Sequence, residues 1–501
     1  MEKENKLIEQ KKKKISEWIK EPNNLIFIGI LIFAFIVRWY FFSLTKTQPL
    51  WWDEADYMNM ANYFGFGTPY HFIPVRPILF SMAIGFILKI SNSEFLIRFI
   101  MLLSSMASVV GIYYLGKEIL NEKVGLIASL LTSVIWLNLF LTFRILVDIP
   151  SLTFFTFSAL FFYKYFKTNS KKALYIGSAI IGIGTLIRLP TATFLFAILL
   201  YVLITERFRF LRKKEYWIAA IIFILVLSPY LIWGYIQFHG FVIAQAGAHN
   251  APEGPLFQNM LANLKSYLSL FSNYFSWPLL IIFVLGLFSM YKIFIGFDVL
   301  FKGDDVQLKR DLYLLLIFLI PLIVVSFSLA YIEDRYILIV FPAILIISSK
   351  FILELYTFIN KKEKFLAWIF LILFLGLVIY LQLQSANSLI KDKQNSYIEV
   401  KEAGLWLRQN TEPSAVIATR SRPQIKYYSE REVFEFPETQ EEFEKALLSP
   451  PNENVKYYMI SVFEQHNDWL FSYPQEKNLT AAQAYFADQG KTQPMLVIYK
   501  L

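Results

Sequence analysis

Eleven apolar stretches, most of them as long as a membrane-spanning helix, restrict this 501-residue chain to folds that cross a lipid bilayer. Hydrophobic residues make up 56% of the chain and charged residues 17%, whereas soluble proteins have about 45–50% apolar and about 25% charged residues. This composition excludes a soluble globular enzyme. We predict an α-helical polytopic membrane protein. The predicted spans are residues 25–44, 95–116, 124–142, 148–166, 173–187, 190–204, 216–236, 276–295, 312–331, 336–352 and 365–384.

The distribution of basic residues predicts which side of the membrane each loop faces. The apolar segment Ile78–Ile90 is too short for an ordinary span and is typical of an interfacial helix. If it does not cross, the Lys- and Arg-rich loops 117–123, 164–172, 207–214 and 361–364 all lie on one side. Such a side is cytoplasmic. The pattern predicts a cytoplasmic N-terminus and an extracytoplasmic C-terminus in the cell (plasma) membrane, and it explains the net charge of +9 without nucleic acid.

The composition divides the chain into two predicted domains. Residues 1–384 form the transmembrane domain, whose first extracytoplasmic loop, 45–94, contains juxtamembrane helices. From 385 to 501 charged residues return, and short apolar runs alternate with helical patterns. We expect a small extracytoplasmic α/β domain there. Its predicted strands are 415–419, 457–462 and 495–499, and its predicted helices are 397–409 and 440–448.

Carboxylates gather in the loops that this topology places outside. Asp53, Glu54 and Asp56 begin a predicted surface helix in the first loop, and Asp148 lies at the start of a span. Charges at a membrane edge are costly, so they indicate a functional site. Helix capping is the alternative for Asp53 and Asp148. We predict Asp53, Glu54 and Asp148 as catalytic candidates.

Arginines are predicted at the same membrane surface. Arg76, Arg188 and Arg335 lie in three different predicted outer loops, and Arg38 lies near the outer end of the first span. A guanidinium group binds phosphate through a planar set of donors. The alternative for each arginine is an anchor at a helix end. These four arginines, together with Tyr57 and His71 of the first loop, are the predicted substrate- and phosphate-binding residues.

The sequence offers few options for cofactors. It has no cysteine, which excludes thiolate metal sites, and no histidine pair has a ligand spacing. A divalent cation on Asp53, Glu54 and Asp148 remains an option, because hard cations prefer oxygen ligands. We find no phosphate-binding glycine loop or dinucleotide motif. The energy for any reaction must therefore arrive with an activated substrate in the membrane, and no other cofactor is expected.

These residues resemble those of the GT-C superfamily of integral membrane glycosyltransferases, and most of all its protein O-mannosyltransferase and lipid A aminoarabinose transferase branch. The similarity covers nearly the whole chain in short motifs. Asp56 departs from it, because the branch often has arginine or another residue there. The motifs are Asp-Glu-Ala-x-Tyr at 53–57, Arg76-Pro77, Tyr-Leu-Gly-Lys at 114–117, Asp-Ile-Pro-Ser at 148–151, Leu-Ile-Arg-Leu-Pro at 186–190, Arg335-Tyr336, Ala418-Thr419 and Tyr-Tyr-Ser at 427–429.

The resemblance implies an inverting glycosyltransferase that takes a sugar from a polyprenyl-phosphate carrier. It implies that Asp53 is the catalytic base, that Asp148 orients the acceptor or the base, and that Arg76 binds the carrier phosphate. The acceptor would be a lipid, a glycan or a protein. Two other classes stay open: a transporter or flippase of polyprenyl-linked lipids, and a membrane scaffold. A transporter would place charges along a path through the bilayer, whereas here they gather at one edge.

Overall fold

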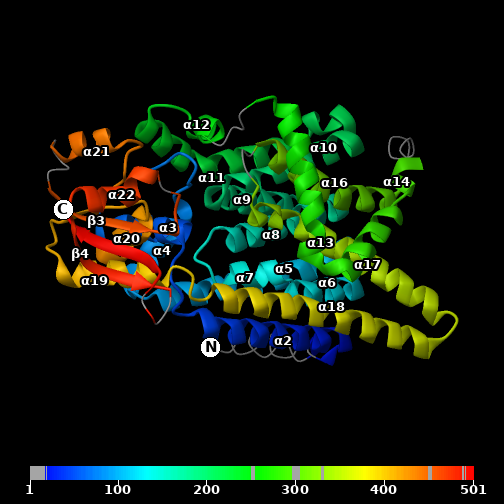
Figure 1. Cartoon of the computed structure of the whole chain (residues 1–501). Coiled ribbons are helices and arrows are strands. Elements are labelled where there is room, and N and C mark those ends of the chain that lie inside the picture. The colour runs from blue at the N-terminus through cyan, green and yellow to red at the C-terminus, as the bar shows by residue number, and fades with distance from the viewer. Residues whose placement is uncertain are drawn as a thin grey trace, which may run out of the picture.

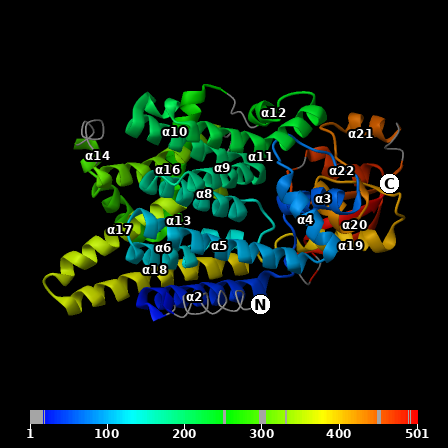
Figure 2. The ribbon, with the colours of Figure 1, turned by 180° about the vertical axis from the view of Figure 1, so that it is seen from behind.

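The computed structural model consists of a long helical bundle with a small α/β part at one end (Figure 1). It describes residues 17–18, 20–249, 254–295, 305–328, 332–448, 454–465, 467–487, 490 and 492–501. Figure 2 shows the same arrangement from behind, with the α/β part next to α3 and α4 and the turn between α17 and α18 at the far end of the bundle. The predicted combination of a polytopic helical fold and a small C-terminal α/β part is confirmed.

Nine of the eleven predicted spans each fall on one helix or on a short 3-10 turn and the helix that continues it, except that residues 329–331 lie outside the described residues. The bundle helices are α2 (Pro22–Thr45), α5 (Glu94–Ile119), α6 (Glu122–Val134), α7 (Trp136–Thr142), α8 (Asp148–Thr168), α9 (Lys171–Ile187), η1 (Leu189–Ala192), α10 (Thr193–Glu206), η2 (Arg207–Arg212), α11 (Lys214–Phe238), α12 (Val242–His249), α13 (Leu256–Phe288), α14 (Lys292–Ile295), α16 (Val306–Ser328), η3 (Asp334–Val340), α17 (Phe341–Asn360) and α18 (Lys364–Lys393). The span 124–142 is divided between α6 and α7, and the span 276–295 covers only the part of α13 after its kink at Ser276, together with α14.

Length and hydropathy support nine of the eleven predicted spans within the described ranges. Eight helices are long and apolar enough to cross a membrane, and α6 with α7 makes a ninth, bent by 59°. The other two, α8 and α9, do not meet that criterion. Serines and threonines of α8 are buried within the bundle, and α9 has 17 residues. Neighbouring helices can shield such polar groups from lipid.

The first loop folds into two short helices that cross closely. The helix α3 (Trp52–Phe66) ends at Gly67, whose φ of 76° suits glycine. The helix α4 (Leu79–Ile90) is the short apolar segment that we predicted not to cross. A Cβ atom on Gly85 would lie 2.5 Å from the carbonyl oxygen of Ala61. Only glycine lets α4 lie this close to α3, and this contact fixes the loop that carries the predicted acids.

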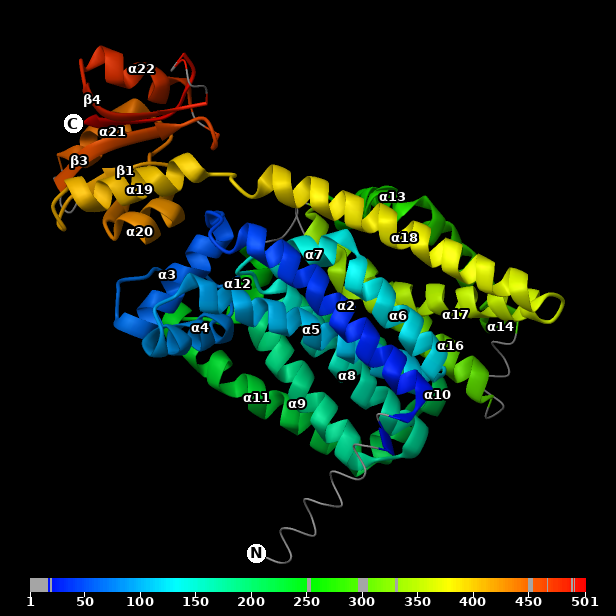
Figure 3. The same ribbon diagram turned by 90° about the horizontal axis from the view of Figure 1, so that it is seen from below.

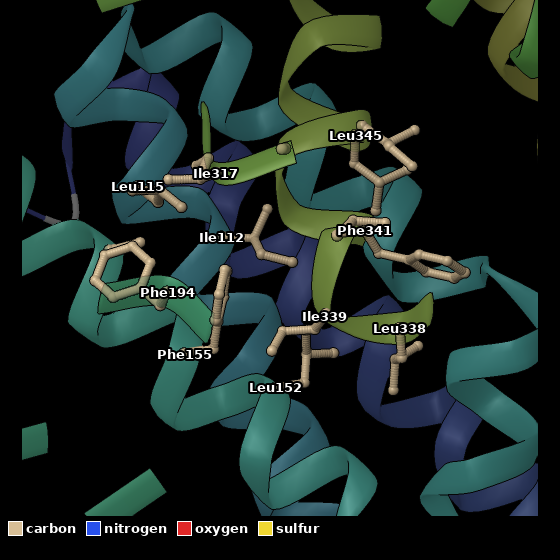
Figure 4. Close-up of a cluster of buried hydrophobic side chains, with 14 of the residues drawn as sticks. Ile112, Leu115, Leu152, Phe155, Phe194, Ile317, Leu338, Ile339, Phe341 and Leu345 are labelled. Carbon is tan, nitrogen blue, oxygen red and sulfur yellow. The ribbon is translucent and has the colours of Figure 1, made fainter. Parts of the chain in front are cut away.

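The core of the bundle is apolar and lies between its packed helices. Figure 4 shows where side chains of α5, α8, α10, α16, η3 and α17 meet. Burying such large side chains stabilises each by about 1.5–3 kcal/mol. The core thus holds η3, which carries Arg335, against α8, which begins at Asp148. The labelled residues are Ile112, Leu115, Leu152, Phe155, Phe194, Ile317, Leu338, Ile339, Phe341 and Leu345.

The α/β part contains a mixed five-stranded sheet in the order β2-β1-β3-β5-β4. The strand β1 pairs in parallel with β2 and β3, and β5 pairs antiparallel with β3 and β4. Three of the five strands and two of the four helices, α19 and α21, were predicted; β2, β4, α20 and α22 were not. The strands are β1 (Val416–Ala418), β2 (Glu432–Phe434), β3 (Val455–Ser461), β4 (Thr480–Phe486) and β5 (Pro494–Lys500), and the helices are α19 (Ile398–Asn410), α20 (Arg422–Ser429), α21 (Gln440–Leu447) and α22 (Asp468–Glu476).

The α/β part packs directly on the first loop (Figure 3). The backbone N–H of Leu50 donates to the hydroxyl of Tyr428 at 2.8 Å. The side chain of Asn59 donates to the carbonyl of Pro423 at 2.8 Å, and Tyr427 donates to Glu94 at 3.1 Å. These contacts place the sheet and its helices at the end of the bundle that carries the predicted acids.

Candidate active site

Asp53 lies in the first turn of α3, where two arginines from distant segments meet it. Arg335 of η3 approaches Asp53 Oδ2 to 2.6 Å, and Arg76 pairs with Asp53 Oδ1. Burial alone would raise the pKa of Asp53, but the charges of Arg76 and Arg335 outweigh it and lower the pKa to about 2. The Asp53 side chain keeps 24% of its surface exposed. This carboxylate is therefore ionised at neutral pH and accessible.

Asp56 lies one turn further along the same face of α3 and holds Arg76 from the other side. Its Oδ2 is 2.8 Å from Arg76 Nε, and Tyr70 donates a hydrogen bond to the same oxygen at 3.2 Å. Burial raises the pKa of Asp56, despite the attraction of Arg76. The surroundings thus push the pKa values of two neighbouring acids in opposite directions, as is typical of functional sites.

Arg188 is held in the same way by Asp148. Arg188 follows the last turn of α9 and has an extended backbone. The chain then turns at Pro190 in η1. Arg188 Nη1 is 2.6 Å from Asp148 Oδ1, and its guanidinium lies 4.9 Å from the centre of the Tyr336 ring. The Asp148 side chain has no exposed surface. Its charge therefore acts through Arg188, which it contacts, and through Arg335, which it attracts, rather than by direct contact with a substrate as a catalytic acid.

A cavity of about 170 Å³ brings the three predicted arginines together. Arg76, Arg188 and Arg335 line it, with Asp53 and Tyr57 beside them. The guanidinium of Arg76 lies 4.8 Å from the centre of the Tyr57 ring. Three cations around one small space form a site suited to a phosphate group.

A second, larger cavity of about 620 Å³ lies on the other side of Asp53. Its wall is mainly aromatic and aliphatic, with Arg144 and Lys393 as its further cations. Asp53, Glu333 and Arg335 line both cavities. The acid predicted as the base therefore lies where an arginine-rich space meets an apolar one. The aromatic residues of the larger cavity are Trp51, Trp52, Trp136, Phe140 and Tyr397.

Glu54 does not reach either cavity, although it was predicted as a catalytic candidate. Its side chain is fully buried. It accepts hydrogen bonds from Arg98 and Arg144, at 3.3 and 3.2 Å, and from the backbone N–H groups of Trp51 and Ile145. A carboxylate with no exposed surface cannot contact a substrate. Glu54 instead ties the start of α3 to α5 and to the loop after α7.

Two predicted binding residues also lie elsewhere. Arg38 is buried within the bundle and donates hydrogen bonds to Ser105 Oγ and to the carbonyl of Ser133, so it cannot bind a phosphate at this site. It lies about two turns before the end of α2 and faces the neighbouring helices, a direction that its sequence position did not reveal. His71 is exposed and lines a third cavity of about 220 Å³, against α20 and beside Asp56.

The geometry does not support the predicted cation site. Asp53, Glu54 and Asp148 each pair with arginine, and the part of the chain that the structure describes contains no group of three or more metal-ligating side chains close enough to hold an ion. Arginines occupy the positions around these carboxylates that a cation would need.

Several residues that shape the site lie in loops and motifs that the sequence singled out, but no role in the site was predicted for them. Tyr336 lies under both Arg188 and Arg335, and Glu333 pairs with Arg335. The guanidinium of Arg144 stacks on Trp51 at 3.7 Å. The Glu-Asp-Arg-Tyr sequence at 333–336 and the Asp53/Asp56 spacing were the available signals, but neither reveals which partner each side chain meets.

Comparison with known proteins adds a family and a fold. Residues 75–233, less than half of the chain, match the family described as dolichyl-phosphate-mannose-protein mannosyltransferase. The matched segment includes Arg76, Asp148 and Arg188, and begins after Asp53. No curated protein sequence matches the chain significantly.

Several solved structures share the fold at low sequence identity. ArnT from Cupriavidus metallidurans in the apo state superposes with a TM-score of 0.63 at 12% identity, over 94% of this chain and 97% of that chain. The same protein bound to undecaprenyl phosphate gives 0.61 at 12% identity, with the same coverage. The archaeal oligosaccharyltransferase AglB from Archaeoglobus fulgidus, in complex with an inhibitory peptide and a dolichol-phosphate, gives 0.57 at 12% identity, over 87% of this chain and 69% of that chain.

Proposed function

We propose that this chain, which shares its fold with ArnT and AglB and matches a mannosyltransferase family over residues 75–233, is a GT-C superfamily protein and an inverting glycosyltransferase. It moves a sugar from a polyprenyl-phosphate carrier to an acceptor hydroxyl, with Asp53 as the base. The single observation that carries this proposal is the position of Asp53, which lines both the arginine-rich and the apolar cavity.

The arginine-rich cavity is the proposed site of the carrier phosphate. In the reaction, the acceptor oxygen attacks the anomeric carbon, the bond from that carbon to the phosphate oxygen breaks, and the phosphodiester becomes a phosphate monoester. Its charge changes from one to two negative charges. Arg76, Arg188 and Arg335 would stabilise the additional charge as it develops. Buried or partly buried carboxylates already hold these arginines in place.

The larger cavity is the proposed entry for the acceptor. A base must come within about 2.6–3.2 Å of the hydroxyl that it deprotonates. Asp53 is ionised but paired with two arginines, which weakens it as a base. A carrier phosphate would compete for Arg76 and Arg335 and would raise the pKa of Asp53, making it a stronger base when the donor is bound. The acceptor would be a lipid, a glycan or a protein.

The proposed orientation places this site on the extracytoplasmic side of the cell membrane, with the N-terminus in the cytoplasm. The supporting observation is that the basic loops 164–172, 207–214 and 361–364 belong to the bundle end opposite α3. Residues 1–384 and 385–501 remain the proposed transmembrane and extracytoplasmic domains.

The test follows release of polyprenyl phosphate by purified protein in nanodiscs, supplied with a panel of radiolabelled polyprenyl-phosphate sugars. Wild type is compared with Asp53→Asn and with Asp468→Asn, the same chemical change at an exposed helix start in the α/β part. We expect Asp53→Asn to lower turnover by about 10²–10⁴-fold, the usual contribution of a general base. Asp468→Asn should retain turnover.

Two outcomes would contradict the proposal. Retained turnover in Asp53→Asn would remove Asp53 as the base. Tight donor binding without consumption of any donor would favour the alternative, a transporter of polyprenyl-linked lipids, which a lipid-flipping assay in vesicles would then test.

A further inference from the structure

A cavity of about 360 Å³ lies at the opposite end of the bundle from Asp53. It is formed where α5 ends and α6 begins, and where α16 begins and α17 ends. The helix α17 starts just after Arg335 of the candidate active site, and from Phe341 to Phe358 it rises by about 26 Å at 1.5 Å per residue. That distance is close to the roughly 30 Å thickness of a bilayer's hydrocarbon core. The cavity therefore lies near the opposite membrane edge, at the depth of lipid headgroups.

A buried lysine lines this cavity with unused hydrogen-bonding capacity. The Lys350 side chain is 7% exposed. Its Nζ donates to Ser289 Oγ at 3.2 Å, while the nearest oxygens of Asp311 and Glu354 are both 3.6 Å away. An ammonium group has three donors. The two carboxylates lower the cost of burying the charge, but they lie beyond ordinary hydrogen-bond distance.

Two further cations line the same cavity. Arg310 contacts Asp311 through Nε at 3.1 Å, and its two terminal nitrogens have no hydrogen-bond or ion-pair partner among the described residues. Lys361 is exposed and likewise has no ion-pair partner within the described ranges. Glu354 is the only carboxylate among the lining residues. The lining therefore carries three positive charges and one negative charge, and with the buried Asp311 behind Arg310 and Lys350 the cluster keeps one net positive charge.

Part of the cavity wall is apolar, and an aromatic side chain in it is exposed at the surface. Leu353 lines the cavity, and Phe358 is 62% exposed beside it. A soluble anion gains nothing from such a wall, whereas the acyl chains of a lipid would pack against it. Basic pockets between transmembrane helices at this membrane edge are suited to anionic headgroups.

We propose that this cavity binds the headgroup phosphate of an anionic phospholipid, with Arg310, Lys350 and Lys361 as its cations and Phe358 against the acyl chains. The excess of positive lining charge favours an anionic lipid over a zwitterionic one. This site is separate from the site of the proposed transfer reaction. A lipid bound there lies at the membrane edge opposite Asp53.

The experiment uses the full chain in neutral detergent with short-chain phosphatidylglycerol as the probe. Dioctanoyl phosphatidylglycerol, dioctanoyl phosphatidylcholine and inorganic phosphate are titrated at constant ionic strength, with the midpoint of thermal unfolding and native mass spectrometry as readouts. We expect phosphatidylglycerol to stabilise the wild type and to remain bound, with at least tenfold tighter binding than phosphatidylcholine.

The matched variants carry equal changes in net charge. The double variant Arg310→Gln/Lys361→Gln should weaken phosphatidylglycerol binding by about tenfold or more, since hydrogen bonds to charged groups are among the stronger ones. The control Lys123→Gln/Lys364→Gln removes two exposed charges at the same edge that do not line the cavity. It should bind phosphatidylglycerol as the wild type does. Lys350 is left in place because, once Arg310 is replaced, it is the remaining cation beside the buried Asp311.

Several outcomes would overturn the proposal. Equal binding of phosphatidylglycerol and phosphatidylcholine would contradict recognition of an anionic headgroup. Equal losses in the two double variants would show attraction by general surface charge. Stabilisation by inorganic phosphate equal to that by the lipid would show a phosphate site without a lipid. Donor turnover should persist in both double variants, so this test is independent of the proposed glycosyl transfer.

Discussion

Two ion-pair networks start from adjacent residues of α3 and differ in their access to solvent. The cavity network joins Asp53 to Arg76 and Arg335, and the side chains of all three are 13–24% exposed. The buried network joins Glu54 to Arg98 and Arg144, and the side chains of all three are 0–2% exposed. Neighbouring residues on a helix point about 100° apart, so one turn serves two surroundings.

The difference in exposure indicates different roles for the two networks. The cavity network is suited to binding a ligand, and the buried network to stabilising the fold. A ligand can compete for arginines in the cavity network, because these side chains are accessible. In the buried network only Arg144 lines a cavity, with 2% of its side chain exposed, and every hydrogen bond of Glu54 holds protein to protein. The buried network stacks Arg144 on Trp51, the residue just before α3, and so fixes the turn that presents Asp53. Burial lowers the pKa of Arg144 to about 10, so it remains charged at neutral pH.

The largest predicted effect is in the buried network. Glu54→Gln removes the charge that neutralises Arg98 and Arg144, and should destabilise the protein by about 3–5 kcal/mol, as does breaking other buried ion pairs. The measurement is thermal unfolding in detergent, with size-exclusion chromatography to detect aggregation. Glu94→Gln is the control, because Glu94 is 3.9 Å from Arg98 and 25% exposed. Equal stability of Glu54→Gln and wild type would show that the network is not structural.

The next effect concerns the cavity network and appears in binding of the donor. Arg76→Ala removes a charged donor group from the proposed phosphate site, so it should weaken donor binding by about 1.5–3 kcal/mol, roughly tenfold to a hundredfold. We expect KM for the donor to rise and KM for the acceptor to change little. Arg408→Ala, an exposed arginine of α19, is the control. An equal rise in both KM values would indicate that Arg76 has a structural role.

The sequence predicted which residues form the cavity network. It did not predict that Glu54, the neighbour of Asp53, belongs to a separate and buried network. Arg76, Arg188 and Arg335 lie in three separate predicted outer loops, and topology alone predicted that they share a membrane edge. Hydropathy also distinguished α4 from a span. Asp53 and Glu54 have the same charge and the same apparent context, and only packing against α5 and the α7–α8 loop shows which one is buried.

The errors at Arg38 and Asp148 have the same origin. An arginine in an apolar span is expected to extend to the membrane edge, but Ser105 and the carbonyl of Ser133 satisfy Arg38 inside the bundle. Asp148 was correctly placed at the start of its helix, yet its pairing with Arg188 removes it from the cavity surface. Span positions can be read from hydropathy, whereas side-chain direction depends on tertiary neighbours.

A smaller effect should come from replacing Asp56, which pairs with Nε of Arg76 while Asp53 pairs with a terminal nitrogen. Asp56→Asn keeps the shape but removes the charge, so Arg76 should be oriented less well and donor binding should weaken by roughly tenfold or less. Since Asp56 would act through Arg76, the double variant Asp56→Asn/Arg76→Ala should be no worse than Arg76→Ala alone, a non-additive result expected for residues in contact. Additive losses in donor KM would contradict this positioning role.

The smallest effect is a pH dependence that distinguishes the carboxylate of Asp53 from an ordinary exposed acid. Its pKa is lowered from 3.8 to about 2 by Arg76 and Arg335, so its ion pairs contribute fully to stability when the pH is above the pKa of the unfolded chain. As the pH falls from about 4 to about 2, the unfolded chain takes up the proton first and this contribution is lost. The difference in thermal midpoint between wild type and Asp53→Asn should therefore stay constant from pH 7 to pH 5 and shift against the wild type below pH 4. A difference that stays constant below pH 4 would show that the pKa of Asp53 is not lowered, and would remove the accessible ion pairs that set the cavity network apart from the buried one.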